Sequence, residues 1–392
     1  MLTRRNLVVN GLRASALIPT LPLLGAALPQ ASHGDKVLVV VQLSGGNDGL
    51  NTVIPVRQDN YWRLRPHLGL AKARMHPVTG DAALHPAMGK LAELYHEGQV
   101  AILQGVGLPE ANRSHFRSMD IWHTASFQQP VPSSGWLGRL ADRIASGTPG
   151  SLPALAIGGG ELPLSLRADR VQASAVRDAS NLRLDSRASR IATAREALLD
   201  NPRSGDLKFL AETARASYRT AERLAALDQE RSTVDYPNTA LAKGFSTVAQ
   251  LVAAGLGCRL FHLSLDGFDT HARQAPIHAD RLAKLSGAIG AFQRDLDSRG
   301  IAERVRTLVF SEFGRRAGEN GSKGTDHGHG APAFVIGKGV AGGLQGKAPD
   351  LDALVDGDVP ATQDFRGVYA ALENDWMGVP GDWTGERVKL SD

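Results

Sequence analysis

Short apolar runs alternate along the chain with longer stretches whose apolar residues recur at helical spacing. The runs, several of them rich in β-branched residues, predict strands at 37–43, 100–106, 152–157, 258–265, 305–310 and 331–336. The amphipathic or alanine-rich stretches between them predict helices at 88–98, 135–145, 239–255, 276–299 and 365–377. Repeated strand, loop and helix units predict a three-layer α/β/α sandwich with a mainly parallel central sheet.

One internal stretch departs from this alternation. Residues 168–231 are rich in Arg, Ala, Asp and Ser and contain few large apolar residues. Their helix-favouring composition predicts a helical insertion, charged on its solvated faces, within a single domain at 36–392. We do not expect a second catalytic domain there.

The N-terminal residues 1–31 differ again. Arg4 and Arg5 precede a weakly hydrophobic segment that prolines interrupt, and small residues follow it. This order is typical of a signal peptide of the twin-arginine type and not of a membrane-spanning helix. We expect cleavage after Ala27 or Ala31, export by the twin-arginine machinery to the periplasm or the medium, and no transmembrane segment in the mature chain.

Composition limits the chemistry. The chain has 392 residues, of which 42% are apolar, which is enough for a substantial core. Its single cysteine, Cys258, excludes an intramolecular disulfide and a CxxC site, so a metal would be held by His, Asp and Glu. The net charge of +4 is small and the charges are interleaved, which argues against a nucleic-acid partner.

Acidic and imidazole side chains follow or precede the predicted strands. In an open α/β sheet the loops at the carboxyl ends of parallel strands meet at one edge, where ligands bind. Carboxylate and imidazole ligands gathered there would suit a divalent cation such as Zn, Mn or Ca. The candidate ligands are Asp48, Asp269, His271, Glu312, Asp326, His327 and His329.

Each candidate also has an ordinary structural explanation. Asp48 lies among glycines in a loop of turn-forming residues, and Glu312 could pair with Arg315 or Arg316. The glycine-rich loop 318–330 could be a surface segment. The hypothesis of a shared site therefore depends on all of these loops falling on one rim.

Ser114 follows the strand predicted at 100–106, in the segment Arg113 to Phe116. A serine displayed after a strand, at the start of a helix, is a common position for a nucleophile, and it is also a common helix cap. Both interpretations stay open. Arg113, His115 and Lys323 are candidates for holding the oxygens of an anionic group.

Several motifs resemble the bacterial family known as domain of unknown function 1501. They are LVVVQLSGGNDGLNTVIP at 38–55, RSHF at 113–116, YPNTALA at 236–242, DGFDTH at 266–271, VFSEFGRR at 309–316 and GTDHGHG at 324–330. The resemblance runs from about residue 36 to the C-terminus. It implies an alkaline phosphatase-like fold, of the superfamily that includes the sulfatases, whose members use a Ser, Thr or modified Cys nucleophile and Asp and His ligands for one or two divalent cations.

The resemblance also implies roles for individual residues. Asp48 takes the first ligand position, and Ser114 lies in the nucleophile loop. Asp269 and His271 fall where a later ligand pair lies, although their spacing is narrower than is common in the superfamily. Two segments compete for the Asp-His-Gly position: Glu312 with Phe313, or Asp326 with His327. Glu312 and His327 are the favoured ligands there.

The function implied is an exported, metal-dependent hydrolase of phosphate or sulfate esters. The alternative is a non-catalytic envelope or glycan-binding protein that retains a degenerate fold, which Phe313 in place of histidine favours. A serine hydrolase fits less well, because the chain has no G-x-S-x-G motif, and it has no Walker A motif either.

Overall fold

The computed structural model describes residues 36–145, 153–159, 161–171, 173–176, 232–255 and 257–390. The predicted signal segment 1–31 lies outside these ranges, as does most of the predicted helical insertion. Within that insertion the described residues Ala173–Val176 form an edge strand, β7, so the helical prediction is wrong at these positions. They pair in parallel with β6 (Ala154–Ile157), which supplies the hydrogen bonds that such a short strand needs.

The central sheet is built around β1 (Val37–Ser44), which lies between β8 (Leu260–Asp266) and β9 (Val305–Ser311) and runs parallel to both. β6 and β7 extend the sheet beyond β8. On the other side of β9 lie β10 (Ala331–Ile336), β5 (Val100–Gly107), β11 (Gly343–Gln345) and the short β12 (Gln363–Asp364).

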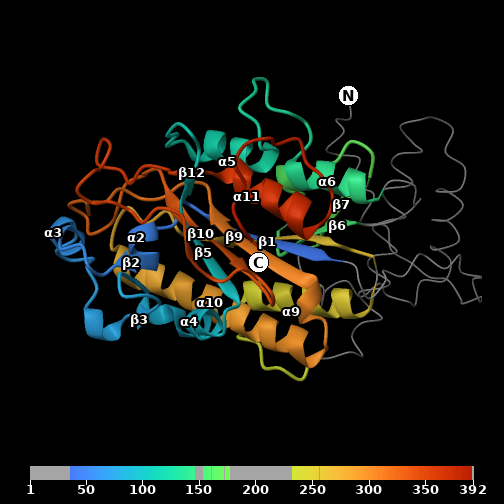
Figure 1. Cartoon of the computed structure of the whole chain (residues 1–392), viewed down its shortest axis with the longest axis horizontal. Coiled ribbons are helices and arrows are strands. Elements are labelled where there is room, and N and C mark those ends of the chain that lie inside the picture. The colour runs from blue at the N-terminus through green and yellow to red at the C-terminus, as the bar shows by residue number, and fades with distance from the viewer. Residues whose placement is uncertain are drawn as a thin grey trace, which may run out of the picture.

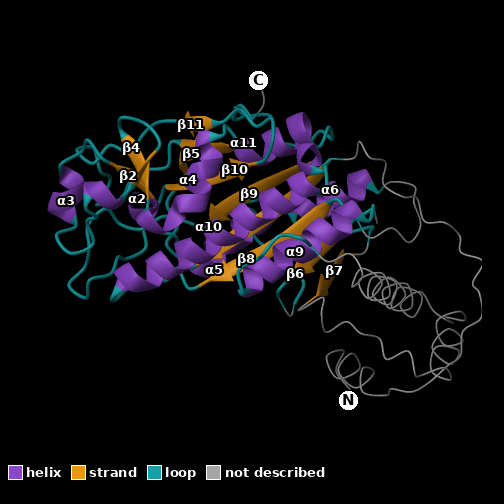
Figure 2. Cartoon of the chain, turned by 90° about the horizontal axis from the view of Figure 1, so that it is seen from below, coloured by secondary structure: helices purple, strands orange, loops and turns teal. Residues whose placement is uncertain are grey.

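Helices cover both faces of this sheet (Figures 1 and 2). Val39 and Val41 of β1 pack into one hydrophobic core, and Leu38 and Val40 pack into the other, as the alternation of a strand requires. The first core is covered by α4 (Gly89–His96), α9 (Ala240–Ala253) and α10 (Gln274–Ser298). The second is covered by α5 (His115–Thr124), α6 (Trp136–Ile144) and α11 (Phe365–Ala370), which continues as a π-helix at Ala371–Trp376.

One strand of the main sheet runs against the others. β10 is antiparallel to both of its neighbours, β9 and β5. The segment 312–330, which joins β9 to β10, therefore begins and ends at the same edge of the sheet. That edge also carries the loops that follow β1, β5 and β8, so four loops distant in sequence are brought together.

A small outer layer closes this edge. β2 (Val53–Pro55), β4 (Ala82–Leu84) and β3 (His76–Pro77) form a three-stranded sheet, joined to β1 through the short α2 (Gly49–Thr52). Together with α3 (Asn60–Leu64), this layer encloses a third apolar cluster that contains Ile54 and Tyr61. The layer places Arg65, a fully buried side chain, beneath the loop that follows β1.

The predicted three-layer α/β/α architecture with a mainly parallel sheet is confirmed. The strands and helices predicted from the apolar pattern all appear among the described residues, with ends displaced by a few residues at most. Within the described part of the chain, no helix is both long enough and apolar enough to cross a membrane.

Candidate metal centre

Three side chains from three loops converge at the carboxyl edge of the sheet. His115 begins α5, Asp269 follows β8, and His327 precedes β10. One ligand atom from each lies within 4.8 Å of the other two. His271 joins them: its Nε2 is 3.0 Å from Oδ1 of Asp269 and 3.0 Å from Nε2 of His327.

The three imidazoles are oriented in the same way. In each ring Nδ1 lies at hydrogen-bond distance from an oxygen acceptor. The pairs are His115 with Oε1 of Glu312 (2.9 Å), His271 with Oδ1 of Asp326 (3.0 Å) and His327 with the carbonyl oxygen of Arg113 (2.9 Å). Because a carbonyl or carboxylate oxygen only accepts, each Nδ1 carries a proton, and whenever a ring is neutral its lone pair is on Nε2. This arrangement is typical of histidines that bind a metal.

The three Nε2 atoms differ in their hydrogen-bond partners. Nε2 of His115 is buried and has no hydrogen-bond partner. Nε2 of His271 and Nε2 of His327 lie 3.0 Å apart, and they lie 3.0 Å and 3.1 Å from Oδ1 of Asp269, so each can donate a proton to that oxygen or, once deprotonated, direct its lone pair to a cation. Three Nε2 atoms beside a carboxylate fit a divalent cation with imidazole and carboxylate ligands.

Asp269 is kept ionised by its neighbours. Its partial burial would raise the pKa, but hydrogen bonds from Arg315 and His327 outweigh this and lower the pKa of Asp269 to about 2. Arg315 donates to Oδ1 at 2.6 Å. The opposite oxygen, Oδ2, lies 3.6 Å from Nε2 of His115. The cluster therefore contains a permanent negative charge at neutral pH.

Arg315 also fastens the loops around the cluster. Its buried guanidinium donates to the carbonyl oxygens of Gly46 (2.7 Å), Thr325 (2.8 Å) and Phe268 (3.1 Å), and to that of Gly45. These carbonyls belong to the loops after β1, after β8 and before β10. Gly45 has φ +115°, and a Cβ there would lie 2.4 Å from the amide nitrogen of Asp269, so only glycine fits.

Glu312 is a buried acid that positions His115. Its Oε1 accepts hydrogen bonds from the amide of Gly45 at 2.8 Å and from His115 at 2.9 Å. The hydrogen bond to Glu312 raises the pKa of His115, against the lowering that burial alone would cause. The backbone carbonyl of Glu312 accepts from Nε1 of Trp122, whose own carbonyl accepts from the hydroxyl of Tyr369. Glu312 thus connects the cluster to the helical layer of α5 and α11.

Phe313 forms an apolar wall beside two of the imidazoles. Its ring centroid is 4.8 Å from that of His115 and 4.9 Å from that of His327. The side chain is buried, and it leaves no room for a Cβ at Gly46. In this position Phe313 restricts rotation of the His115 and His327 rings, and it supplies no metal ligand.

The structure does not bring Asp48 to this cluster. Asp48 is fully buried and forms a 2.6 Å ion pair with Arg65. Its carboxylate also accepts from the side-chain amide of Gln274 and, at 3.4 Å, from the amide of Asn51. Burial would raise the pKa of Asp48, but the charge of Arg65 and its hydrogen bond lower it overall. Its two oxygens are thus occupied by protein donors.

The other candidate residues lie around the cluster. His329 Nε2 bonds to the carbonyl of Leu108 at 2.8 Å, away from the other imidazoles. The Arg113 guanidinium pairs with Asp358 at 2.6 Å. Ser114 is exposed and caps α5, its Oγ accepting from the amide of Arg117 at 3.4 Å. Lys323 is exposed on the loop before β10.

Sequence reasoning missed two features of this region. His115 was expected to hold an anion, yet its imidazole lies with the candidate ligands. The available signal was its place after a strand, the same place that pointed to Asp269. Arg65 could not be predicted, because nothing in the sequence indicates that an arginine after α3 reaches the loop following β1. Arg315 pairs with Asp269, and not with Glu312 as the sequence also allowed.

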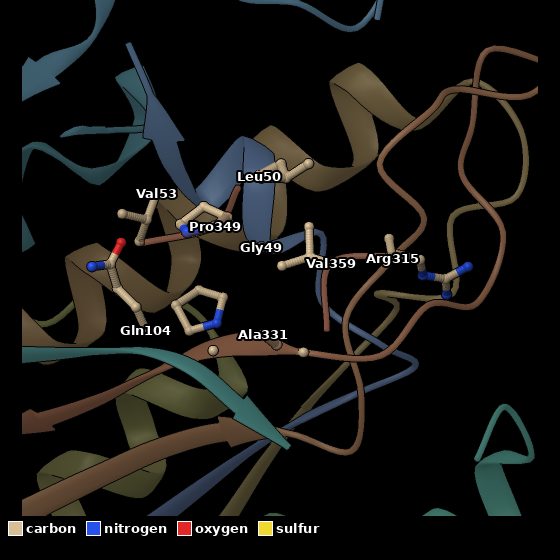
Figure 3. Close-up of a pocket in the computed structure, with 11 residues that line it drawn as sticks. Gly49, Leu50, Val53, Gln104, Arg315, Ala331, Pro349 and Val359 are labelled. Atoms are coloured by element: carbon tan, nitrogen blue, oxygen red, sulfur yellow. The ribbon is translucent and has the colours of Figure 1, made fainter. Parts of the chain in front are cut away.

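A small, largely apolar cavity lies beside the cluster. Figure 3 shows Gly49, Leu50 and Val53 facing Gln104 and Ala331 across it. Arg315 is the charged residue among those that line it, and none of the three imidazoles does so. This cavity is therefore distinct from the space that the three imidazoles surround.

The family of the chain follows from its sequence. The model of the family described as protein of unknown function (DUF1501) matches residues 35–367. The chain belongs to the DUF1501 family. The match includes every residue of the cluster in this DUF1501 chain. No curated protein matches its sequence at a significant level.

Solved structures similar to the DUF1501 chain have low sequence identity to it. The lipoteichoic acid synthase LtaP from Listeria monocytogenes is 8% identical, with 93% of this chain and 76% of that chain covered and a TM-score of 0.37. A phosphonate monoester hydrolase from Silicibacter pomeroyi is 10% identical, with coverages of 90% and 76% and a TM-score of 0.40. A protein in the alkaline phosphatase superfamily from Vibrio parahaemolyticus is 12% identical, with coverages of 91% and 72% and a TM-score of 0.36.

Proposed function

We propose that this protein is a metal-dependent hydrolase of phosphate or sulfate esters. The observation that carries the proposal is the convergence of His115, Asp269 and His327, whose ligand atoms lie within 4.8 Å of one another. His271 supplies a further Nε2 beside them. Three or four imidazole and carboxylate donors suit zinc or manganese better than calcium, which prefers oxygen ligands.

A divalent cation bound there would supply Lewis acidity toward an oxygen of a phosphoryl or sulfuryl group. The chain's own residues hold the donor set in place. Glu312 and Asp326 orient the imidazoles of His115 and His271, and Arg315 keeps Asp269 ionised and in position. In this proposal Glu312 and Asp326 are orienting groups, while Asp48 and His329 stabilise the surrounding loops.

Ser114 is the proposed nucleophile. Its exposed hydroxyl lies at the N-terminus of α5, where the aligned peptide dipoles leave a partial positive charge. This charge favours an anionic substrate group and stabilises negative charge that develops on the attacking oxygen. His115, the residue that follows Ser114, contributes its imidazole to the cluster. The hydroxyl of Ser114 is therefore carried by the residue directly before a candidate ligand. Lys323 is the exposed cation proposed to contact the anion.

We also propose that the protein is exported. The support is the Arg4–Arg5 pair followed by a weakly hydrophobic segment, which is typical of twin-arginine signals. This route carries folded proteins, so a metal would be loaded before export. Replacing both arginines with lysine should leave the protein in the cytoplasm, measured by cell fractionation. Normal export of that variant would exclude the twin-arginine route.

Elemental analysis of purified protein tests the metal centre. We expect Zn or Mn in the wild type and its loss in Asp269→Asn, together with loss of hydrolysis in a screen of aryl phosphates, phosphodiesters and sulfates. Asp81→Asn is the matched control, because Asp81 is an exposed acid paired with Arg57. A folded wild type that binds none of Zn, Mn and Ca would overturn the proposal.

Ser114→Ala tests whether Ser114 acts in catalysis without taking part in metal binding. We expect metal content to stay at the wild-type level while turnover falls by about a thousandfold or more, as it does when nucleophiles are removed. Loss of the cap itself should lower the free energy of unfolding by only about 1 kcal/mol. Unchanged turnover would exclude Ser114 as the nucleophile. A metal-loaded wild type inactive on every ester would favour the non-catalytic binding protein.

A further inference from the structure

A second cavity lies in the helical layer that contains α5, at the C-terminal end of that helix, whereas the metal centre lies at its N-terminal end. It is enclosed by the C-terminal end of α5, by α6, by α11 with its π-helix, and by the segment that follows them. Most of the residues that line it are polar or charged. The charged residues that line it are Arg139, Arg143, Arg366, Glu373 and Asp382. None of them belongs to the metal centre.

The three guanidinium groups differ in their partners. Arg143 donates to Oε1 of Glu373 at 2.8 Å. Arg366 donates to Asp364 at 2.6 Å and lies over the ring of Trp383, 4.2 Å from its centroid. Arg139 is different. Its bonds go to two backbone carbonyls, those of Thr124 (2.7 Å) and Ser134 (3.1 Å), and no carboxylate of the described residues accepts from it.

Arg139 therefore forms no direct ion pair with a described residue, although the negative charges of Glu373 and Asp382 lie near enough to raise its pKa. Arg139 is half-buried, and its desolvation lowers its pKa overall. Guanidinium groups bind carboxylates and phosphates strongly because their planar donors match these acceptors. A partly desolvated guanidinium that faces a cavity, and bonds only to neutral oxygens, is suited to an anionic ligand.

The backbone of the cavity wall is also unusual. Glu373 lies in a π-helix, at Ala371–Trp376, and such segments are rare and often occur at functional sites. Burial raises the pKa of Glu373 to about 7, so its repulsion of an incoming anion is weakened near neutral pH. Gly381 gives this carboxyl its space, since a Cβ there would lie 1.7 Å from Oε2.

We propose that this cavity is a second binding site, which takes a small molecule bearing a carboxylate or phosphate group, with Arg139 as the principal partner of that group. Thr124, at the end of α5, and Ser134 hold the guanidinium in place through their carbonyls. Ser126 and Gln128 line the same cavity and offer neutral polar atoms for the rest of the ligand. The site does not depend on the metal centre or on hydrolysis.

Binding is best measured where the metal centre cannot contribute. Metal-free Asp269→Asn protein is titrated with inorganic phosphate and, separately, with citrate, and binding is followed by tryptophan fluorescence, because Trp136 and Trp383 line the cavity. We expect saturable binding of at least one probe, and the better probe identifies the preferred acid group. No saturable binding of either probe would overturn the proposal.

Three further substitutions, each made in that background, locate the binding site. Arg139→Gln should weaken binding at least tenfold, and Ser126→Trp, which fills the cavity without touching the bonds of Arg139, should do the same. Arg57→Gln, at an exposed arginine paired with Asp81, is the matched control and should change affinity less than twofold. Circular dichroism confirms that each variant is folded. Equal affinity in Arg139→Gln, Ser126→Trp and the control would place the anion elsewhere and overturn the proposal.

Discussion

Asp48 and Asp269 are alike in sequence and differ in their surroundings. Each follows one of two neighbouring parallel strands, β1 or β8, and each forms a 2.6 Å ion pair with a fully buried arginine. The Asp48 side chain has no exposed surface, whereas 49% of the Asp269 side chain is exposed. Protein donors occupy both oxygens of Asp48. Imidazoles surround Asp269.

The difference shows what distinguishes a structural acid from a candidate ligand. The guanidinium of Arg65 and the amide of Gln274 are permanent donors, so they compete with any cation for Asp48. The imidazole Nε2 atoms near Asp269, by contrast, can lose their protons and then offer lone pairs to a cation. We therefore expect Asp269, and not Asp48, to be available to a cation.

The largest effect we expect is the loss of stability in Asp48→Asn. This change leaves Arg65 buried without its counter-ion, which should lower the free energy of unfolding by about 3–5 kcal/mol. Urea denaturation measures the change, and Asp81→Asn serves as the control. Metal content per folded molecule should stay at the wild-type level. A stable Asp48→Asn protein that has lost its metal would show instead that Asp48 is a ligand.

Asp269→Asn should reverse this pattern. Because its side chain is half exposed, we expect a small change in unfolding free energy, measured on metal-free protein. Metal affinity should fall at least about a hundredfold, or about 2.7 kcal/mol, since a charged ligand is lost. Competition with a chromophoric chelator measures this. An equal loss of stability in Asp269→Asn and Asp48→Asn would show that Asp269 is as much a structural acid as Asp48.

Glu312→Gln and Asp326→Asn test the acids that orient the imidazoles. Removing such a partner typically costs about ten- to a hundredfold in metal affinity. Glu312 is buried and Asp326 is exposed, so the larger loss should follow the Glu312 substitution, because water can replace Asp326. The same chelator competition compares them. A greater loss from Asp326→Asn would indicate that Asp326 itself binds the metal.

The smallest expected effect is a dependence on acid pH. The pKa of Asp269 is lowered from 3.8 to about 2, so the stability that its ion pair contributes is complete above pH 3.8 and is lost as the pH falls through about 2. Exposure to solvent limits this contribution to less than about 1 kcal/mol. Subtracting the unfolding profile of metal-free Asp269→Asn from that of metal-free wild type isolates it. A difference that grows as the pH falls would contradict the sign.

The main features of the fold could be predicted from the sequence because its signals are local. The valine-rich run at 37–43 and the apolar run at 305–310 become central strands, and the amphipathic stretch at 276–299 becomes α10 with an end displaced by two residues. The direction of β10 could not be predicted in this way, since an apolar run does not show which way its strand runs. Nor does composition reveal an edge strand such as β7, which depends on pairing with β6.

The candidate site could be predicted only as a set of loops. Their positions after strands indicated that Asp269, His271 and His327 would meet, and the structure brings these three together. Sequence could not separate Asp48 from them, because the partner that occupies it, Arg65, comes from the outer layer. Likewise, the role of Glu312 depends on the distance between its carboxylate and His115, which is set by packing.

The reversed direction of β10 has a consequence for how the site can vary. Since both ends of the segment 312–330 are fixed at one edge, by Arg315 near its start and by His327 near its end, its middle can change length without shifting the sheet. Insertions around residue 321, an exposed glycine, would then alter what reaches the imidazoles while leaving their geometry intact. In the hydrolase that we propose, this segment is where a change in chain length would alter the access of a substrate.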